Sequence, residues 1–311
     1  MTQPLPAPLP ATGQRDFVGY GAKPPHPQWP GGARLALQFV INYEEGGENC
    51  ILDGDQASES LLSEVVGAAP WPGQRNLIVE SLYEFGARAG FWRLHRLFTQ
   101  RQIPVTVYGV TAALVRNPEA VAAMQAADWE IASHGLRWID YKDFSEAEER
   151  ADIAQALHLH EKATGSRPLG WYTGRVSAFT RKIIMEDGGF LYDSDSYADE
   201  LPYWLAGPKG PHLVIPYTLD ANDARFVSPQ GFNSGDQFFS YLKDSFDLLY
   251  AEGQSAPKML SIGLHCRISG RPGRAAALAR FLDYAQGHAQ VWIPRRIDIA
   301  RHWHAHHKPS G

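Results

Sequence analysis

Five short polar clusters, each directly after an apolar run, contain the side chains that could do chemistry. They are Glu44-Glu45, Ser133-His134, and residues 171–175, 193–197 and 265–267. Carboxylates and imidazoles together can move the protons of a hydrolysis, or can bind a metal ion. Each of these residues alone is as easily explained by a structural ion pair or a satisfied buried histidine. Their shared position after predicted strands is therefore the main indication of one site.

Apolar runs alternate with helical patterns and predict the elements that position these clusters. The predicted strands are residues 34–41, 103–109, 129–133, 169–172, 190–193, 213–216, 258–264 and 291–293. Helical patterns lie at residues 79–100, 118–127, 145–164, 178–187, 235–253 and 272–287. These β-α units predict an α/β fold, a barrel of about seven to eight parallel strands with helices outside. The carboxyl ends of barrel strands converge on one face, so distant clusters can form a single site.

The composition is that of a globular protein. The 311 residues are 44% hydrophobic and 20% charged, with a formal charge of -5. Such a chain has no basic stripe for nucleic acid or an anionic membrane. No apolar run reaches the ~20 residues that span a bilayer, and the N-terminus lacks the features of a signal peptide. With only Cys50 and Cys266, the sequence favours a cytoplasmic protein without a disulfide framework.

Three segments fall outside the repeating pattern. Residues 1–32 hold eight prolines and predict an extended arm ahead of a single barrel domain at residues 33–311. Residues 48–76 lack periodicity and are expected to be a functional insertion or an oligomer contact. A homo-oligomer is therefore expected, with a tetramer as the candidate form. The histidine-rich tail at residues 302–307 resembles a metal-binding tract, but a frayed and exposed terminus is the favoured interpretation.

The order of the clusters resembles that of the polysaccharide deacetylase family, also called the NodB homology family. The resemblance extends over residues 34–295 and implies a distorted (β/α) barrel with five sequential motifs. In order, these motifs resemble residues 42–46 (NYEEG), 133–138 (SHGLRW), 171–175 (WYTGR), 193–197 (DSDSY) and 262–265 (IGLH).

The chain departs from that family at the metal positions. In metal-dependent members, the second acid of the first motif and two histidines of the second bind zinc or a similar ion. The matching residues here are Glu45, His134 and Trp138. An indole N–H has no available lone pair, so Trp138 cannot be the third ligand. The sequence therefore predicts an enzyme without a metal or another cofactor.

Together with residues 80–86 (ESLYEFG) and 90–95 (GFWRLH), this departure resembles the metal-independent allantoinase branch of the family. The resemblance implies hydrolysis of a small molecule, allantoin, whose hydantoin ring is opened to allantoate in purine catabolism. Without the resemblance, the residues indicate only a hydrolase of an amide.

The resemblance also implies roles for single residues. Glu44 has the position of the family's base and would take a proton from water, while Arg175 would orient it. His265 would protonate the departing ring nitrogen, and His134 would donate to the developing oxyanion. The residues expected to hold the substrate are Glu45, Trp138, Trp171, Tyr172 and Asp195.

Other functions stay open at this point. A metal-dependent deacetylase of N-acetylated sugars is disfavoured by Trp138 and by the absence of an export signal toward a cell-wall substrate. Another cyclic amide or imide hydrolase would use the same groups. A binding protein that forms oligomers would bind its ligand without turnover, and the combination of acid, arginine and histidine argues against it.

Overall fold

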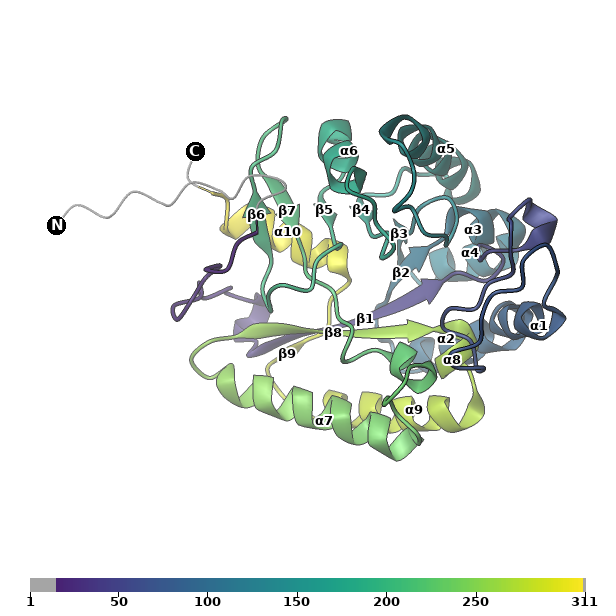
Figure 1. The fold of residues 1–311 in the computed structure, drawn as a ribbon. Helices are drawn as coiled ribbons and strands as arrows, with labels where there is room; N and C mark the ends of the chain where they lie inside the picture. The colour runs from purple at the N-terminus through teal and green to yellow at the C-terminus, as the bar shows by residue number, and fades with distance from the viewer. Residues whose placement is uncertain (1–14, 310–311) are drawn as a thin grey trace.

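The computed structural model describes residues 15–309, and a curled, mostly parallel sheet lies at its centre (Figure 1). The strands are β1 Leu35–Tyr43, β2 Thr106–Gly109, β3 Glu130–Ser133, β4 Gly170–Trp171, β5 Tyr192–Asp193, β6 Tyr203–Leu205, β7 His212–Val214, β8 Lys258–His265 and β9 Val291–Trp292. Their order is β6-β7-β5-β4-β3-β2-β1-β8, and β9 pairs with the start of β1. Within the described sheet, only the β6–β7 pairing is antiparallel. The predicted barrel of parallel strands is confirmed, with the sheet curled into a half-barrel.

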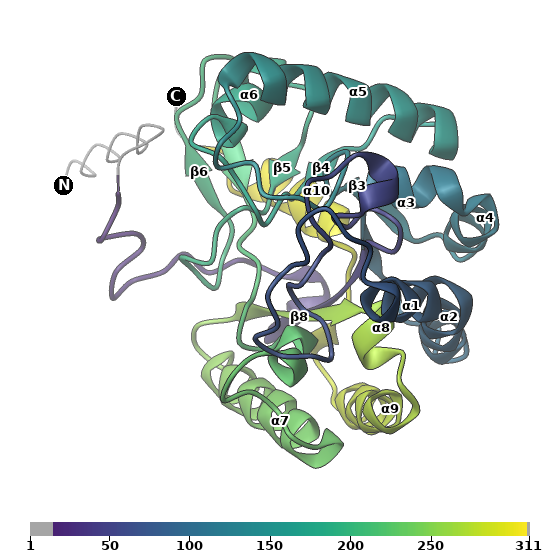
Figure 2. The ribbon, with the colours of Figure 1, turned by 45° about the vertical axis from the view of Figure 1, so that its right-hand side comes forward.

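Helices surround the sheet (Figure 2). They are α1 Leu77–Phe85, α2 Phe91–Thr99, α3 Thr111–Arg116, α4 Pro118–Ala126, α5 Glu146–Thr164, α6 Thr180–Asp187, α7 Gly235–Glu252, α8 Cys266–Ser269, α9 Pro272–Gln286 and α10 Arg296–His306. A π-helix, Gly86–Gly90, joins α1 to α2, so the helical pattern predicted at residues 79–100 is one continuous helical path. Gly90 is needed there because a Cβ would overlap the Cys266 carbonyl. No described helix combines the length and apolar character needed to cross a membrane.

The central strands end level with one another. Tyr43 at the end of β1 pairs with Gly109, Gly109 pairs with Ser133, and Ser133 pairs with Trp171. On the other side of β1, strand β8 ends at His265. The residues that follow these strands therefore emerge on the same face of the sheet.

The two faces of the sheet pack against different partners. Inside the curl, Tyr108, Tyr172 and Tyr217 form an aromatic cluster with Val40 and Ala132. On the outside, apolar residues of the strands pack against the helices in a much larger cluster. This division follows from the alternation of side chains along each strand.

One buried arginine connects strands across the interior. The Arg296 side chain is fully buried and donates hydrogen bonds to the side chains of Gln38, Ser261 and Ser194 and to the carbonyls of Ile215 and Pro216. The interior charge is thus surrounded by neutral acceptors. A buried charge is tolerated where such bonds replace water.

The segment after β7 returns to the open edge of the sheet. Asn222 forms a parallel bridge with Gly263 of β8, and its amide donates to the Thr218 carbonyl. A short 3-10 helix, Asp223–Val227, begins at this point. The bridge brings Asp223 next to the end of β8.

The histidine-rich tail is an ordered helix, so the prediction of a frayed terminus was wrong. Trp303 of α10 is only 1% exposed, and its ring packs 5.8 Å from the ring of Trp29. The imidazole nitrogens Nε2 of His302 and His307 lie 2.7 and 2.9 Å from the Pro27 carbonyl oxygen. Residues before β1 thus anchor the tail. The first 14 residues of the predicted arm lie outside the described part of the chain.

Candidate active site

Side chains from three strand ends meet around one carboxylate. Oε1 of Glu44 lies 3.4 Å from Nε2 of His134 and 3.4 Å from Nε2 of His265. All three residues are nearly fully buried, at 1%, 2% and 4% exposure. They come from the ends of β1, β3 and β8, so the structure brings together three residues that the sequence placed after separate strands.

Arg267, in the first turn after β8, provides the cation that pairs with Glu44. Its Nη1 donates to Oε2 of Glu44 at 2.6 Å. Burial opposes ionisation of Glu44, but Arg267, His265 and a hydrogen bond from His134 hold the pKa of this carboxyl well below its ordinary value. Glu44 is therefore a carboxylate at neutral pH.

Arg175 has a different partner from the one that was predicted. Its Nη1 donates to the Glu59 carboxylate at 3.2 Å and to the Trp138 carbonyl at 3.1 Å. The loop after β4 directs the arginine toward the insertion at residues 48–76, because Glu59 lies there. The guanidinium that orients Glu44 in this structure is that of Arg267, so the residue predicted for this contact is corrected.

Asp223 holds the other side of the His265 ring. Its Oδ1 lies 2.6 Å from Nδ1 of His265, and its Oδ2 accepts from the backbone N–H groups of His265 and Ser269. Burial lowers the pKa of His265, but Glu44 and Asp223 more than compensate and raise the pKa to about 9. His265 is thus an imidazolium at neutral pH and can donate a proton.

Glu45 holds the backbone around Glu44. Its Oε1 accepts from the Arg267 backbone N–H, and its Oε2 accepts from the Glu44 backbone N–H, both at 3.1 Å. Gly86 makes room for this carboxyl, because a Cβ at that position would overlap it. Burial raises the pKa of Glu45 to about 7. The nearby Arg267 cation acts to lower this pKa, and the Glu44 carboxylate acts to raise it.

In metal-dependent members of the family that this chain resembles, three residues bind a metal ion. The residues at the matching positions of this chain do not suit a metal ion. Glu45 already accepts two backbone hydrogen bonds. The Trp138 indole has no lone pair to offer, and the Arg267 guanidinium lies 5.2 Å from its ring centre. Within residues 15–309, no group of three or more His, Cys, Asp or Glu residues is arranged to hold a metal ion. A cation of the protein itself is present instead.

The aromatic residues predicted for substrate binding are divided by the alternation of strand β4. Tyr172 points into the curl, with its ring 5.0 Å from the ring of His134 and 4.7 Å from that of Tyr108. Trp171 points outward and packs on Phe190, beneath α5 and α6. The prediction that Trp171 stacks on the substrate is corrected for this reason, since adjacent residues of a strand face opposite sides.

Two further predicted residues have clear local partners. Trp138 is 5% exposed, and the guanidinium groups of Arg175 and Arg267 both lie over its ring. The Asp195 carboxylate accepts from the backbone N–H groups of Thr173 and Gly174. Asp195 thus fixes the loop after β4, and burial together with Asp193 raises its pKa to about 7.

The insertion at residues 48–76, here called the cover, crosses the face where the central strands end (Figure 2). The carbonyl of Leu62 accepts a hydrogen bond from Nε of Arg267, so the cover contacts the site directly. Asp55 accepts from Arg137 at 2.6 Å. The cover explains why polar groups at the end of a barrel are almost inaccessible.

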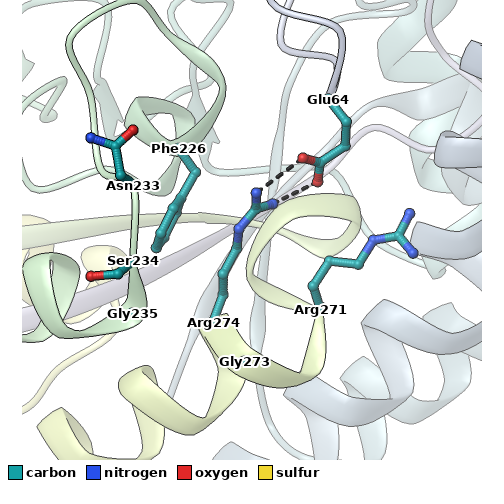
Figure 3. A pocket seen from close by; sticks show the side chains of 8 residues that line it. All are labelled: Glu64, Phe226, Asn233, Ser234, Gly235, Arg271, Gly273 and Arg274. Atoms are coloured by element: carbon teal, nitrogen blue, oxygen red, sulfur yellow. Dashed lines mark hydrogen bonds and ion pairs between the residues drawn. The ribbon is translucent and has the colours of Figure 1, made fainter.

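One edge of the cover is held by an ion pair beside a surface cavity of about 470 Å³ (Figure 3). The Glu64 carboxylate accepts two hydrogen bonds from the Arg274 guanidinium, at 2.6 and 3.0 Å. The guanidinium also lies 4.6 Å from the ring centre of Phe226. This cavity is lined by Glu64 of the cover, Phe226 of the 3-10 helix, and residues at the starts of α7 and α9, and Glu44 is not among them.

Sequence reasoning missed Asp223 and left Arg267 without a role. Arg267 lies in the polar cluster at residues 265–267, so its position was visible. Asp223 follows a stretch without periodicity, and only the acidic turn between Thr218 and Asp223 signals it. Its partnership with His265 depends on the Asn222–Gly263 bridge, which no local pattern indicates.

Comparison with known proteins identifies related chains over nearly the full length. The family model described as polysaccharide deacetylase matches residues 78–188. A curated protein of Schizosaccharomyces pombe, described as a putative polysaccharide deacetylase, is 39% identical, over 94% of this chain and 98% of its own.

Two solved structures are more similar. The crystal structure of PuuE allantoinase is 60% identical, with a TM-score of 0.94, over 95% of this chain and 99% of its own. The crystal structure of a probable polysaccharide deacetylase from Pseudomonas aeruginosa is also 60% identical, with a TM-score of 0.93, over 94% of this chain and 98% of its own. The chain belongs to the polysaccharide deacetylase family.

Proposed function

We propose that this protein is an allantoinase, a hydrolase that opens the hydantoin ring of allantoin to allantoate in purine catabolism. The observation that carries the proposal is the 60% identity to PuuE allantoinase over 95% of the chain. The buried Glu44, His265 and Asp223 supply the acid and base groups that such a hydrolysis needs.

Glu44 and His265 have complementary charge states for the reaction. Glu44 is ionised and takes a proton from water as the water oxygen attacks the ring carbonyl carbon. His265 is protonated and gives its proton to the ring nitrogen as the C–N bond breaks. Positioned groups of this kind typically contribute about 10² to 10⁴ in rate each.

The contact between the two groups also resets the site. After the reaction Glu44 holds a proton and His265 has lost one. The two side chains lie 3.4 Å apart, and the pKa of His265 lies above that of Glu44. Transfer of the proton from Glu44 to His265 is therefore downhill and restores the starting state.

The proposal includes no catalytic metal, because the donor set at Glu45, His134 and Trp138 does not suit one. The test is allantoin hydrolysis by the purified protein, followed as allantoate formation before and after exhaustive chelation, with metal content measured in parallel. We expect full activity in the chelated sample. Activity that is lost on chelation and restored by zinc would refute the metal-independent mechanism. Absence of turnover in both samples would refute the proposed function, and N-acetylated sugars would be tested next.

We propose that the protein is a cytoplasmic homo-oligomer, with a tetramer as the candidate form, with an arm at residues 1–32 and one barrel domain at residues 33–311. The support for self-association is an apolar surface on the cover and the start of α1. Its exposed large hydrophobic residues are Leu52, Leu61, Val65, Val66, Trp71, Leu77 and Ile78. Exposed apolar area of this kind commonly marks a protein interface.

The oligomer is tested by light scattering on the size-fractionated protein. Val66→Glu should reduce the mass by placing a charge in the apolar surface. Leu248→Glu is the control, because Leu248 is 61% exposed on α7 and lies outside that surface. A monomeric wild-type protein, or an unchanged mass for Val66→Glu, would contradict the proposal.

A further inference from the structure

We infer that Arg267 is a catalytic residue whose free Nη2 donates a hydrogen bond to the carbonyl oxygen of the bond being hydrolysed. The inference rests on the proposed function and adds the group that stabilises negative charge in the reaction. It gives the guanidinium the electrostatic role that a metal ion would otherwise fill.

The contacts of Arg267 fix its guanidinium beside the base. Nη1 donates to Glu44 at 2.6 Å, and Nε donates to the Leu62 carbonyl at 3.3 Å. The guanidinium carbon lies 4.3 Å from the ring centre of Tyr83 and 5.2 Å from that of Trp138. Two hydrogen bonds and two aromatic rings leave this planar group little freedom to turn.

One arm of the guanidinium has been left without a partner. Arg267 is 2% exposed, yet its Nη2 has no hydrogen-bond partner among the described residues. Buried polar atoms are almost always bonded, and an exception calls for a ligand or a catalytic explanation. Nδ1 of His134 and the hydroxyl of Tyr83 also lack partners among the described residues; the His134 ring contacts Glu44 through its other nitrogen, Nε2, and the Tyr83 ring lies against the Arg267 guanidinium. Three side chains with an unsatisfied buried atom therefore belong to the cluster that contains the base.

The position of Nη2 suits the chemistry. When water attacks, a C–O bond forms, the electron pair of the carbonyl moves to its oxygen, and Glu44 takes the water proton. Nη1 holds Glu44, and Nη2 is bonded to the same carbon as Nη1, so a carbonyl oxygen on Nη2 lies next to the attacking water. The charge collapses as the C–N bond breaks and His265 protonates the nitrogen. Arg267 neither gains nor loses a proton.

Arg267→Lys tests the inference with the charge retained. We expect kcat to fall by about 10² to 10³, the usual loss for one oxyanion donor, because an ammonium cannot reach both Glu44 and the substrate oxygen. KM should change little, since the interaction strengthens in the transition state. Arg280→Lys is the matched control, because Arg280 pairs with Asp236 on the surface and should keep the wild-type kcat. Circular dichroism establishes that both variants fold.

Chemical rescue separates a catalytic role from a structural one. Guanidinium chloride at low millimolar concentration should restore part of the activity of Arg267→Ala, with saturation, whereas ammonium chloride should not. Should Arg267→Ala fail to fold, because Glu44 loses its buried partner, the kcat of Arg267→Lys decides the question. An unchanged kcat for Arg267→Lys, or a folded Arg267→Ala that guanidinium does not rescue, overturns the inference and leaves the proposed function standing. A wild-type protein without allantoin turnover overturns both.

Discussion

Replacing Asp223 with asparagine should move the alkaline limb of the pH-rate profile to lower pH. Asp223 Oδ1 lies 2.6 Å from Nδ1 of His265 and stabilises the imidazolium. The asparagine amide can instead place an N–H opposite Nδ1, which favours the neutral ring. Its oxygen still accepts the backbone bonds of His265 and Ser269, so the local backbone is kept.

The size of the shift follows from the bond that is lost. A hydrogen bond to a charged group contributes about 1.5 to 3 kcal/mol, and one pKa unit corresponds to about 1.4 kcal/mol. The pKa of His265, raised to about 9 in the native protein, should therefore fall by about one to two units in Asp223→Asn. Since the folded pKa of His265 exceeds its ordinary value of 6.5, its contribution to stability is complete below that value and is lost as pH rises through 9. The variant should lose about 1.5 to 3 kcal/mol of unfolding free energy at pH 6 and much less at pH 10.

The assay is kcat for allantoin between pH 6 and 10, with urea unfolding at both ends of the range. Asp220→Asn serves as the control, because the Asp220 carboxylate accepts its hydrogen bonds from Thr218 and Tyr241. The alkaline limb of the pH-rate profile of Asp220→Asn should match that of the wild type. If kcat of Asp223→Asn declines at the same pH as that of the wild type, His265 is not the acid that Asp223 supports.

Three further substitutions test the site and its cover. Glu44→Gln should lower kcat by about 10² to 10⁴ with the fold intact by circular dichroism, and full activity would exclude Glu44 as the base. Gly86→Ala should destabilise the protein by about 1 to 3 kcal/mol in urea unfolding, because the new Cβ displaces the carboxyl of Glu45; unaltered stability would show that this packing is loose. Glu64→Gln should lower the free energy of unfolding by less than about 1 kcal/mol, because partly exposed ion pairs such as Glu64–Arg274 contribute little to stability. The same substitution should speed amide hydrogen exchange in residues 57–66. Equal exchange in both proteins would mean that the pair with Arg274 does not hold the cover.

The sequence was most informative where function depends on the ends of regular strands. Glu44, His134 and His265 were expected to converge because parallel strands end on one face, and they do meet. Alternation within a strand is fixed by the backbone, yet the sequence of β4 does not tell which side faces the interior. Both Trp171 and Tyr172 are bulky and aromatic, and only packing against α5 and α6 decides between them.

Residues whose roles depend on irregular segments could not be predicted in the same way. The sequence places an arginine after β4 and another after β8, but the long side chain of either can reach several partners. Arg175 reaches Glu59 of the cover, and Arg267 reaches Glu44. Asp223 acquires its role from a single bridge to β8. Such contacts are set by tertiary packing, which leaves no periodic signal.

The cover over residues 44 and 265 has a consequence for what a measured turnover number means. With the base and acid 1% and 4% exposed, we predict that the cover opens for substrate entry and again for product release. Loop motions of this kind take microseconds to milliseconds and set the turnover rate of many enzymes. A substrate trapped beneath the cover is committed to reaction before it can escape, which masks solvent isotope effects on the proton transfers. Variants that slow the chemistry should reveal those isotope effects, whereas variants that loosen the cover should make turnover less sensitive to solvent viscosity.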